Sequence, residues 1–121
     1  MSELEQAALA AAWRDAGQAA WDAERAAWDA EQAAGWAGGP EGDKADLVEA
    51  EAMVALFAAQ IREVAAWEAW KRGEPHPMAR PHGWSNAEML GRLREAVEAW
   101  RQRVLVARDV VGGRARGIAP R

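Results

Sequence analysis

Apolar positions recur along the first third of the chain with the 3.6-residue period of an α-helix, and nearly all of them are alanine. On a helical projection they fall within one arc of about 120°, and the opposite side carries charged and amide side chains. Ser2 and Glu5 have the spacing of a capping box, so the pattern predicts a helix over about 3–34. The alanines of this arc are Ala8, Ala12, Ala16, Ala19, Ala20, Ala23, Ala26, Ala27, Ala30 and Ala34.

Tryptophans border the alanine arc of this first helix. Trp13, Trp21 and Trp28 lie between the arc and the charged side. The unit Ala-Ala-Trp-Asp-Ala-Glu occurs at 19–24 and again at 26–31, and two copies are too few for a repeat protein. The helix therefore has three sectors: small residues, charged residues and a tryptophan border between them.

A second helix is predicted over about 43–72, after the glycine-rich segment 35–42, which predicts a loop. Asp43 is placed to cap this helix. A second apolar patch, with Leu56, Trp67 and Trp70, lies off its main face; such a helix is usually packed between two neighbours, so it is the candidate for the central position. The main face consists of Leu47, Val54, Phe57, Ala58, Ile61, Val64 and Ala65.

A third helix is predicted over about 86–111, after a proline-containing loop at 73–85. Ser85 and Glu88 have the spacing of a second capping box, and Trp84 with Met89 has that of a hydrophobic staple. The apolar positions follow strict 3–4 spacing, which is typical of a coiled-coil seam, and segment 112–121 is predicted to be a basic tail. The seam residues are Leu90, Leu93, Val97, Trp100, Val104, Ala107 and Val111.

These patterns predict an all-α protein, an elongated three-helix bundle with long antiparallel helices and coiled-coil-like packing. The helices form a single domain over 1–111. Short connections favour antiparallel neighbours, and we expect the first helix to pack with both others. Strand formers are scarce, with one phenylalanine and no tyrosine or threonine, whereas the strong helix formers Ala, Glu, Gln, Arg and Leu dominate.

Charge divides the chain into an acidic and a basic part. Residues 1–70 carry 14 acidic and 4 basic side chains, a net of −10, whereas residues 71–121 carry 11 basic and 5 acidic ones, a net of +6. The interpretation we favour is that the two parts neutralise each other inside one bundle. The alternative is an anionic partner for the basic part.

No arrangement of residues predicts catalysis, a metal site or a nucleotide site. There is no cysteine, and the two histidines, His76 and His82, lie in the proline-containing loop without a cluster of carboxylates. The only serines, Ser2 and Ser85, are explained as helix caps, which leaves no nucleophile. We therefore expect no enzymatic activity, no cofactor and no small-molecule substrate.

Tryptophan is the residue type that most favours partner binding in this sequence, because it is enriched at the hot spots of protein interfaces. An alanine face allows two helices to approach closely. A tryptophan beside such a face either packs inside the molecule or anchors a partner, and the sequence leaves both interpretations open for the first helix. The candidate interface residues are Trp13, Trp21, Trp28, Trp36 and Trp70.

A row of arginines marks one edge of the third helix. Arg94, Arg101 and Arg108 are spaced one heptad apart, and Arg114 and Arg116 follow. Arginine matches phosphate groups well, so these residues are candidates for nucleic-acid contact. The same placement suits salt bridges to acidic neighbouring helices, which is the interpretation we favour.

The sequence thus predicts a non-enzymatic helical module for protein interaction or assembly, which acts as an oligomer or with another helical protein. A small phage or mobile-element protein would fit this profile, as a virion assembly component or an inhibitor of a host complex. The alternative is a nucleic-acid-associated accessory protein that uses the arginine-rich part. No stretch is apolar enough for a membrane span and no signal peptide is apparent, so we expect a cytoplasmic or virion location.

Overall fold

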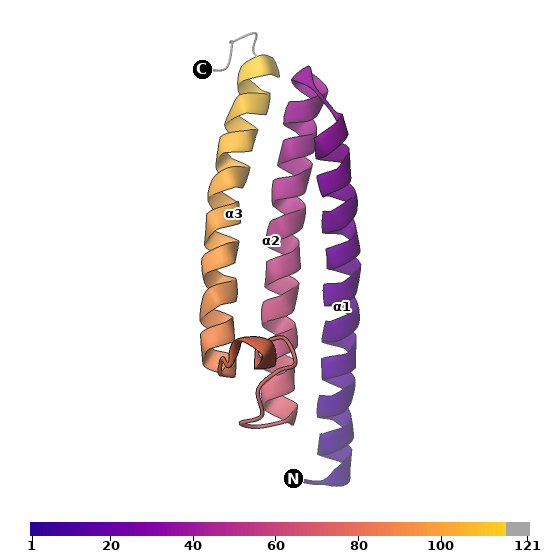
Figure 1. Cartoon of the computed structure of the whole chain (residues 1–121). Helices are drawn as coiled ribbons and strands as arrows, with labels where there is room; N and C mark the ends of the chain where they lie inside the picture. Colours follow the sequence, from indigo (N-terminus) through magenta and orange to yellow (C-terminus); the bar gives the residue numbers. More distant parts are fainter. Residues whose placement is uncertain (116–121) are drawn as a thin grey trace.

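In the computed structural model of the protein, three long α-helices lie side by side in a single row (Figure 1). They are α1 (Glu3–Trp36), α2 (Gly39–Trp70) and α3 (Asn86–Ala115), and a short 3-10 helix, η1 (Arg80–His82), precedes α3. The structure describes the backbone of residues 1–115 and the side chains of residues 1–113. The prediction of an all-α, elongated, antiparallel three-helix bundle is confirmed.

The helix α2 occupies the middle of the row and contacts both of the others, as its two apolar patches predicted. Within residues 1–115, however, α1 and α3 share no contact. The expectation that the first helix packs with both others is wrong, because the two contact stripes of α2 lie on well-separated sides of that helix.

The stripe of α2 that faces α3 carries large side chains. Val64 is completely buried there and forms a core cluster with Ala79, Met89 and Leu93. Partly buried apolar side chains surround this cluster and extend it along both helices and the connecting loop. They are Phe57, Ile61, Met78, Trp84 and Leu90.

The stripe of α2 that faces α1 is built differently. Glu63 marks its position, because its Oε1 atom lies 3.6 Å from the place that a Cβ atom on Gly17 of α1 would occupy. One turn away, Ala59 is 2 % exposed, and it belongs to a series of alanines at every seventh position, Ala45, Ala52, Ala59 and Ala66. Small side chains therefore line much of this seam from both helices, with Leu56 as a larger buried side chain one heptad before Glu63.

The alanine arc of α1 is wider than the surface that α1 buries. Ala20, Ala27 and Ala30 are buried, whereas Ala19 and Ala26 are exposed. A single neighbouring helix covers a narrow seam of the kind that repeats every 3.5 residues, and an arc of about 120° extends beyond it. The excess alanines face solvent within this chain.

The connection between α1 and α2 is shorter than the predicted loop at 35–42. Only Ala37 and Gly38 separate the two helices, and Gly38 rather than Asp43 is the N-cap of α2. Proline is tolerated in the first turn of a helix, where its missing N–H has no partner to lose, so Pro40 does not delay the start. Gly39, with φ of 59°, adopts the left-handed conformation at this reversal.

The start of α3 agrees with the prediction, and its end does not. The Glu88 N–H donates to Ser85 Oγ at 3.1 Å and the Ser85 N–H donates to Glu88 Oε1 at 3.4 Å, which confirms the capping box. The helix continues through Gly112-Gly113 to Ala115, because glycine weakens a helix without terminating it. Residues 116–121 of the predicted basic tail lie outside the described part of the chain.

The small-residue seam between α1 and α2 leads to a stability prediction. Ala27→Leu inserts three extra carbon atoms into that seam, so we expect the free energy of unfolding to fall by about 1–3 kcal/mol. Ala26→Leu, on the exposed side of the same turn, should change it by less than about 0.5 kcal/mol. Urea denaturation followed by circular dichroism measures both values, and equal stability of the two variants would contradict the assignment of the seam.

Candidate interaction surface

Three tryptophans join the beginning of α1 to the end of α2. The ring of Trp13 lies 5.2 Å from that of Trp67 and 5.3 Å from that of Trp70, between centroids, and Trp67 and Trp70 are 5.8 Å apart. Edge-to-face and tilted pairs at such distances add about 0.5–1.5 kcal/mol beyond the area that they bury. Aromatic packing thus compensates at this end for the small contact area of the alanine seam.

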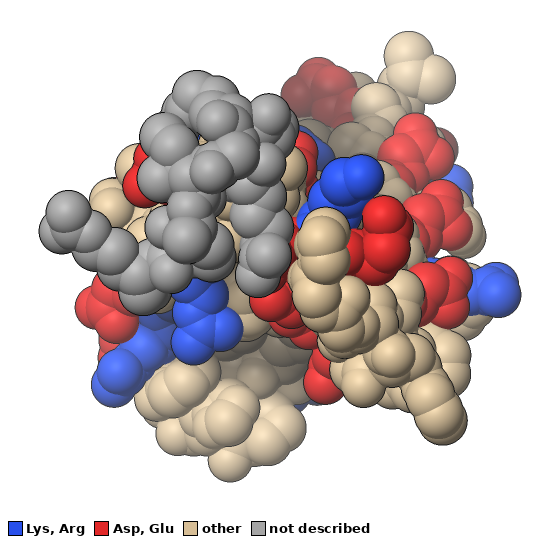
Figure 2. Space-filling view, turned by 90° about the horizontal axis from the view of Figure 1, so that it is seen from above, with Lys and Arg blue, Asp and Glu red and all other residues tan. Residues whose placement is uncertain are grey.

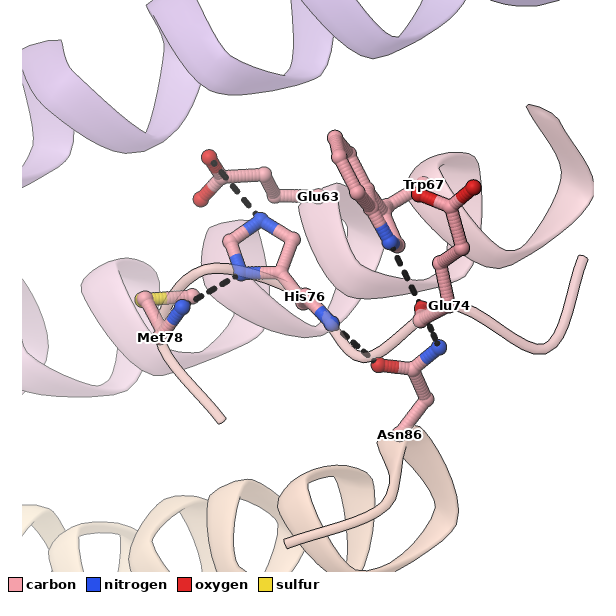
Figure 3. A network of polar contacts seen from close by, with 6 residues as sticks. All are labelled: Glu63, Trp67, Glu74, His76, Met78 and Asn86. Carbon is pink, nitrogen blue, oxygen red and sulfur yellow. Dashed lines mark hydrogen bonds and ion pairs between the residues drawn. The ribbon is translucent and has the colours of Figure 1, made fainter. Parts of the chain in front are cut away.

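The loop between α2 and α3 is attached to the same end by a polar network (Figure 3). Asn86, the first residue of α3, accepts a hydrogen bond from the His76 N–H at 2.7 Å and donates from Nδ2 to the Glu74 carbonyl at 2.8 Å. Its Nδ2 group also contacts a carboxylate oxygen of Glu68, and Trp67 Nε1 donates to the same Glu74 carbonyl. The network therefore links α2, the loop and α3.

His76 lies inside this network and is 2 % exposed. Its Nδ1 atom accepts a hydrogen bond from the Met78 N–H at 3.0 Å, so the neutral ring carries its proton on Nε2. Nε2 points toward Glu63 Oε1 at 3.5 Å, which is ion-pair distance but not good hydrogen-bond geometry (Figure 3). This histidine is therefore a structural part of the polar network that links α2, the loop and α3, and we call that network the clamp.

The five candidate tryptophans divide into two groups. Trp13 and Trp70 are half-buried in the intramolecular cluster with Trp67. Trp21, Trp28 and Trp36 are 54 %, 61 % and 87 % exposed, so none of these three is packed inside the molecule. For the tryptophans of the first helix, Trp13 therefore packs inside the molecule, whereas Trp21, Trp28 and Trp36 are exposed.

Trp21 and Trp28 lie one heptad apart on one side of α1. We call the surface formed by Trp21, Glu24, Trp28 and Glu31 the tryptophan flank. The guanidinium of Arg25 stacks over the Trp21 ring at 5.0 Å, and the flank includes a shallow hollow of about 310 Å³ between the two tryptophans. Glu24 and Glu31 follow at the same seven-residue spacing, since both tryptophans belong to the repeated unit. The repeat thus presents two copies of one surface, an exposed indole followed by a carboxylate.

Glu49 of α2 shows which face of the row the tryptophan flank occupies. It lines a groove of about 460 Å³ with Glu31 and Trp36, and the charge of Glu31 acts on it. Burial raises the pKa of the Glu49 carboxyl above its ordinary value of 4.5, and the neighbouring Glu31 and Asp46 raise it further, against a smaller opposite effect of Arg103. Acidic side chains therefore crowd this face near the α1–α2 connection.

The arginine row of α3 lies on the opposite face. Arg94, Arg101 and Arg108 are all exposed, and Arg108 forms a long ion pair of 3.9 Å with Glu51 of α2. Glu49 and Glu51 are two positions apart, which corresponds to about 200° around a helix, so their side chains lie on opposite faces of α2. The arginine row, which pairs with Glu51, therefore lies on the face opposite to the tryptophan flank. The backbone of Arg114 continues the helix, whereas Arg116 lies outside the described residues.

A groove of about 450 Å³ runs beside this arginine row, between α2 and α3, and we call it the arginine groove. Apolar and charged side chains both line it, and Leu105 is 57 % exposed. The residues around it are Glu51, Val54, Glu98, Arg101, Gln102, Val104, Leu105 and Arg108.

Two features of this arrangement were not found from the sequence. The clamp depends on His76 and Asn86, which come together from a loop and a helix start and carry no periodic signal. The separation of the tryptophan flank from the arginine row depends on the absence of contact between α1 and α3, which helix patterns do not show.

No known protein family, curated protein or solved structure matches this chain. Among the described residues, none of the helices is both long and apolar enough to cross a membrane. The same residues contain no group of three or more histidine, cysteine or carboxylate side chains arranged to hold a metal ion.

The clamp around Asn86 gives a second stability prediction. Asn86→Ala leaves the buried His76 N–H without its acceptor, so we expect the free energy of unfolding to fall by about 1–3 kcal/mol. Gln102→Ala, which removes an exposed amide bonded only to Glu98 on the same helix, is the matched control and should have little effect. Urea midpoints compare the two, and an unchanged midpoint for Asn86→Ala would argue against the clamp.

The raised pKa of Glu49 predicts a pH dependence. Because the folded state holds this proton more tightly than the unfolded chain, the carboxyl lowers stability as the pH rises above 4.5. We expect Glu49→Gln to be more stable than the original chain at about pH 7, with the gain disappearing by about pH 4. Thermal unfolding at both pH values tests this, with Glu95→Gln on the exposed surface of α3 as the control. A gain that is the same at both pH values would refute the interpretation.

Proposed function

We propose that this protein is a non-enzymatic helical module for protein interaction and assembly, and that it acts as an oligomer. The observation that carries the proposal is the exposure of Trp21 and Trp28, one heptad apart on the tryptophan flank. Large aromatic side chains in such a regular exposed array are typical of an interface rather than of a free surface.

The rest of the chain supports this proposal by contrast. Other tryptophans of this chain are covered, since Trp67 is 7 % exposed and packs against Trp13. Trp21 and Trp28 lie on the same helix as Trp13, but within residues 1–115 no helix covers them, because α2 is the one long helix that α1 contacts there. A partner that covers the tryptophan flank would remove this apolar surface from water, which is the main driving force of association.

A nucleic-acid-associated role for Arg94, Arg101 and Arg108 has less support. Carboxylates interrupt the row, because Glu98 lies within it and Glu51 pairs with Arg108. Binding to a polyanion depends on a continuous positive field, and this surface has mixed sign.

Sedimentation velocity tests the proposed oligomer. We expect the original chain to sediment faster as its concentration rises, and the double variant Trp21→Ala/Trp28→Ala to need about 100-fold or more higher concentration for the same association. The control Leu4→Ala/Val48→Ala removes exposed apolar side chains elsewhere and should associate as the original does. If the original chain and the tryptophan variant sediment alike at every concentration, the tryptophan flank is not an interface.

A further inference from the structure

Two rows of charged side chains with the same seven-residue spacing lie at opposite edges of the molecule. On α1, Glu24 and Glu31 bracket the exposed Trp28; on α3, Arg101 and Arg108 bracket the exposed Leu105. Each pair is separated by about 10.5 Å along its helix axis. Because α1 and α3 share no contact within the described residues, these matching rows do not meet inside one chain.

The charge of the two outer helices follows the same division. The α1 segment carries 7 acidic and 2 basic side chains, a net of −5, whereas α3 carries 6 basic and 4 acidic ones, a net of +2. Seen along the helix axes, side chains of both signs occur around this end of the molecule (Figure 2). The interpretation that the acidic and basic parts neutralise each other within one bundle therefore does not extend to α1 and α3.

The arginine groove offers an apolar lining and two guanidinium groups to an aromatic side chain that is flanked by carboxylates. Its lining combines the apolar side chains of Val54, Val104 and Leu105 with the guanidinium groups of Arg101 and Arg108 and with the carboxylates of Glu51 and Glu98. The existing ion pair of Arg108 with Glu51 is long, at 3.9 Å, and the Arg108 side chain is 61 % exposed, so the guanidinium remains accessible to a second carboxylate. An indole in the groove would bring both of its neighbouring carboxylates to the rim.

We propose that the arginine groove of one copy of this chain binds the tryptophan flank of a second copy. Trp28 fills the groove, and Glu24 and Glu31 pair with Arg101 and Arg108 of the other copy. The inference rests on the proposed function and names its partner, a second copy of this chain, and the surface that receives it.

The placement of the two surfaces determines the type of assembly. The tryptophan flank lies on the face marked by Glu49 and the arginine groove on the face marked by Glu51. Each copy therefore offers its flank to one neighbour and its groove to another, which makes the contact heterologous. Such contacts propagate into rings or filaments rather than closing into a two-fold dimer.

Charge exchange tests the pairing directly. The variant Glu24→Arg/Glu31→Arg and the variant Arg101→Glu/Arg108→Glu each place like charges across the contact, so we expect each to associate about 100-fold more weakly than the original chain. An equimolar mixture of the two variants restores opposite charges at every contact, and we expect it to assemble again. The chain that carries all four substitutions should assemble by itself for the same reason.

The matched control is Asp15→Arg/Asp22→Arg, which makes the same change of charge at the same spacing on the outer, charged side of α1. It should assemble as the original does, because those residues lie outside the tryptophan flank. Circular dichroism of each variant verifies the helical content, and recovery of assembly in the mixture shows that both chains are folded.

Other outcomes overturn the inference in distinguishable ways. If the original chain assembles and Trp21→Ala/Trp28→Ala weakens it, but Arg101→Glu/Arg108→Glu has no effect, the groove is not the receiving surface and the proposed function stands. If the only species is a dimer at all concentrations, the heterologous contact is wrong.

A monomer at every concentration overturns both proposals. If Arg101→Glu/Arg108→Glu abolishes low-salt binding to duplex DNA and leaves assembly unchanged, the row is a nucleic-acid surface.

Discussion

One helix, α2, has to bury two stripes of its own surface, and every contact between long helices of the described chain includes it. The stripe toward α3 carries large side chains such as Phe57 and Val64, and their burial provides most of the hydrophobic stabilisation of that seam. The stripe toward α1 carries alanine at every seventh position, and these alanines each bury little area, although Leu56 is also buried. Trp13, packed on Trp67, supplies at one end the area that the alanines lack.

The same constraint explains why so much apolar surface stays exposed. A helix that contacts one neighbour has only a narrow seam covered, and α1 carries apolar residues over a much wider arc. Ala19 and Ala26 fall outside the seam at little energetic consequence, because alanine exposes a small area. Trp21 and Trp28 fall outside it as well, and for them the exposed area is large enough to favour association.

Much of this architecture follows from the sequence, since helix periodicity, the capping box at Ser85 and the second apolar patch of α2 are local signals. The boundaries were less predictable, because Pro40 is compatible with the first turn of α2 and Gly112-Gly113 with the last turn of α3, so neither marks the end of its helix. The exposed tryptophans were among the predicted interface residues. What could not be derived was which of them a neighbouring helix covers, since that depends on α1 and α3 lying at opposite edges of the row.

The lack of contact between α1 and α3 in the described chain also determines how the free energy of unfolding is divided between the two helix–helix contacts. Among the described residues, each outer helix contacts no long helix other than α2, so the energetics resemble those of a linear array with nearest-neighbour coupling. The effects of mutations in the two seams on the free energy of unfolding should therefore be additive, apart from effects transmitted through α2 itself. The array has two partly folded states in which one outer helix has detached and the remaining pair is intact. Detachment of α1 would separate the alanine seam while leaving the clamp around His76 in place, so the two ends of the row are open to independent local unfolding.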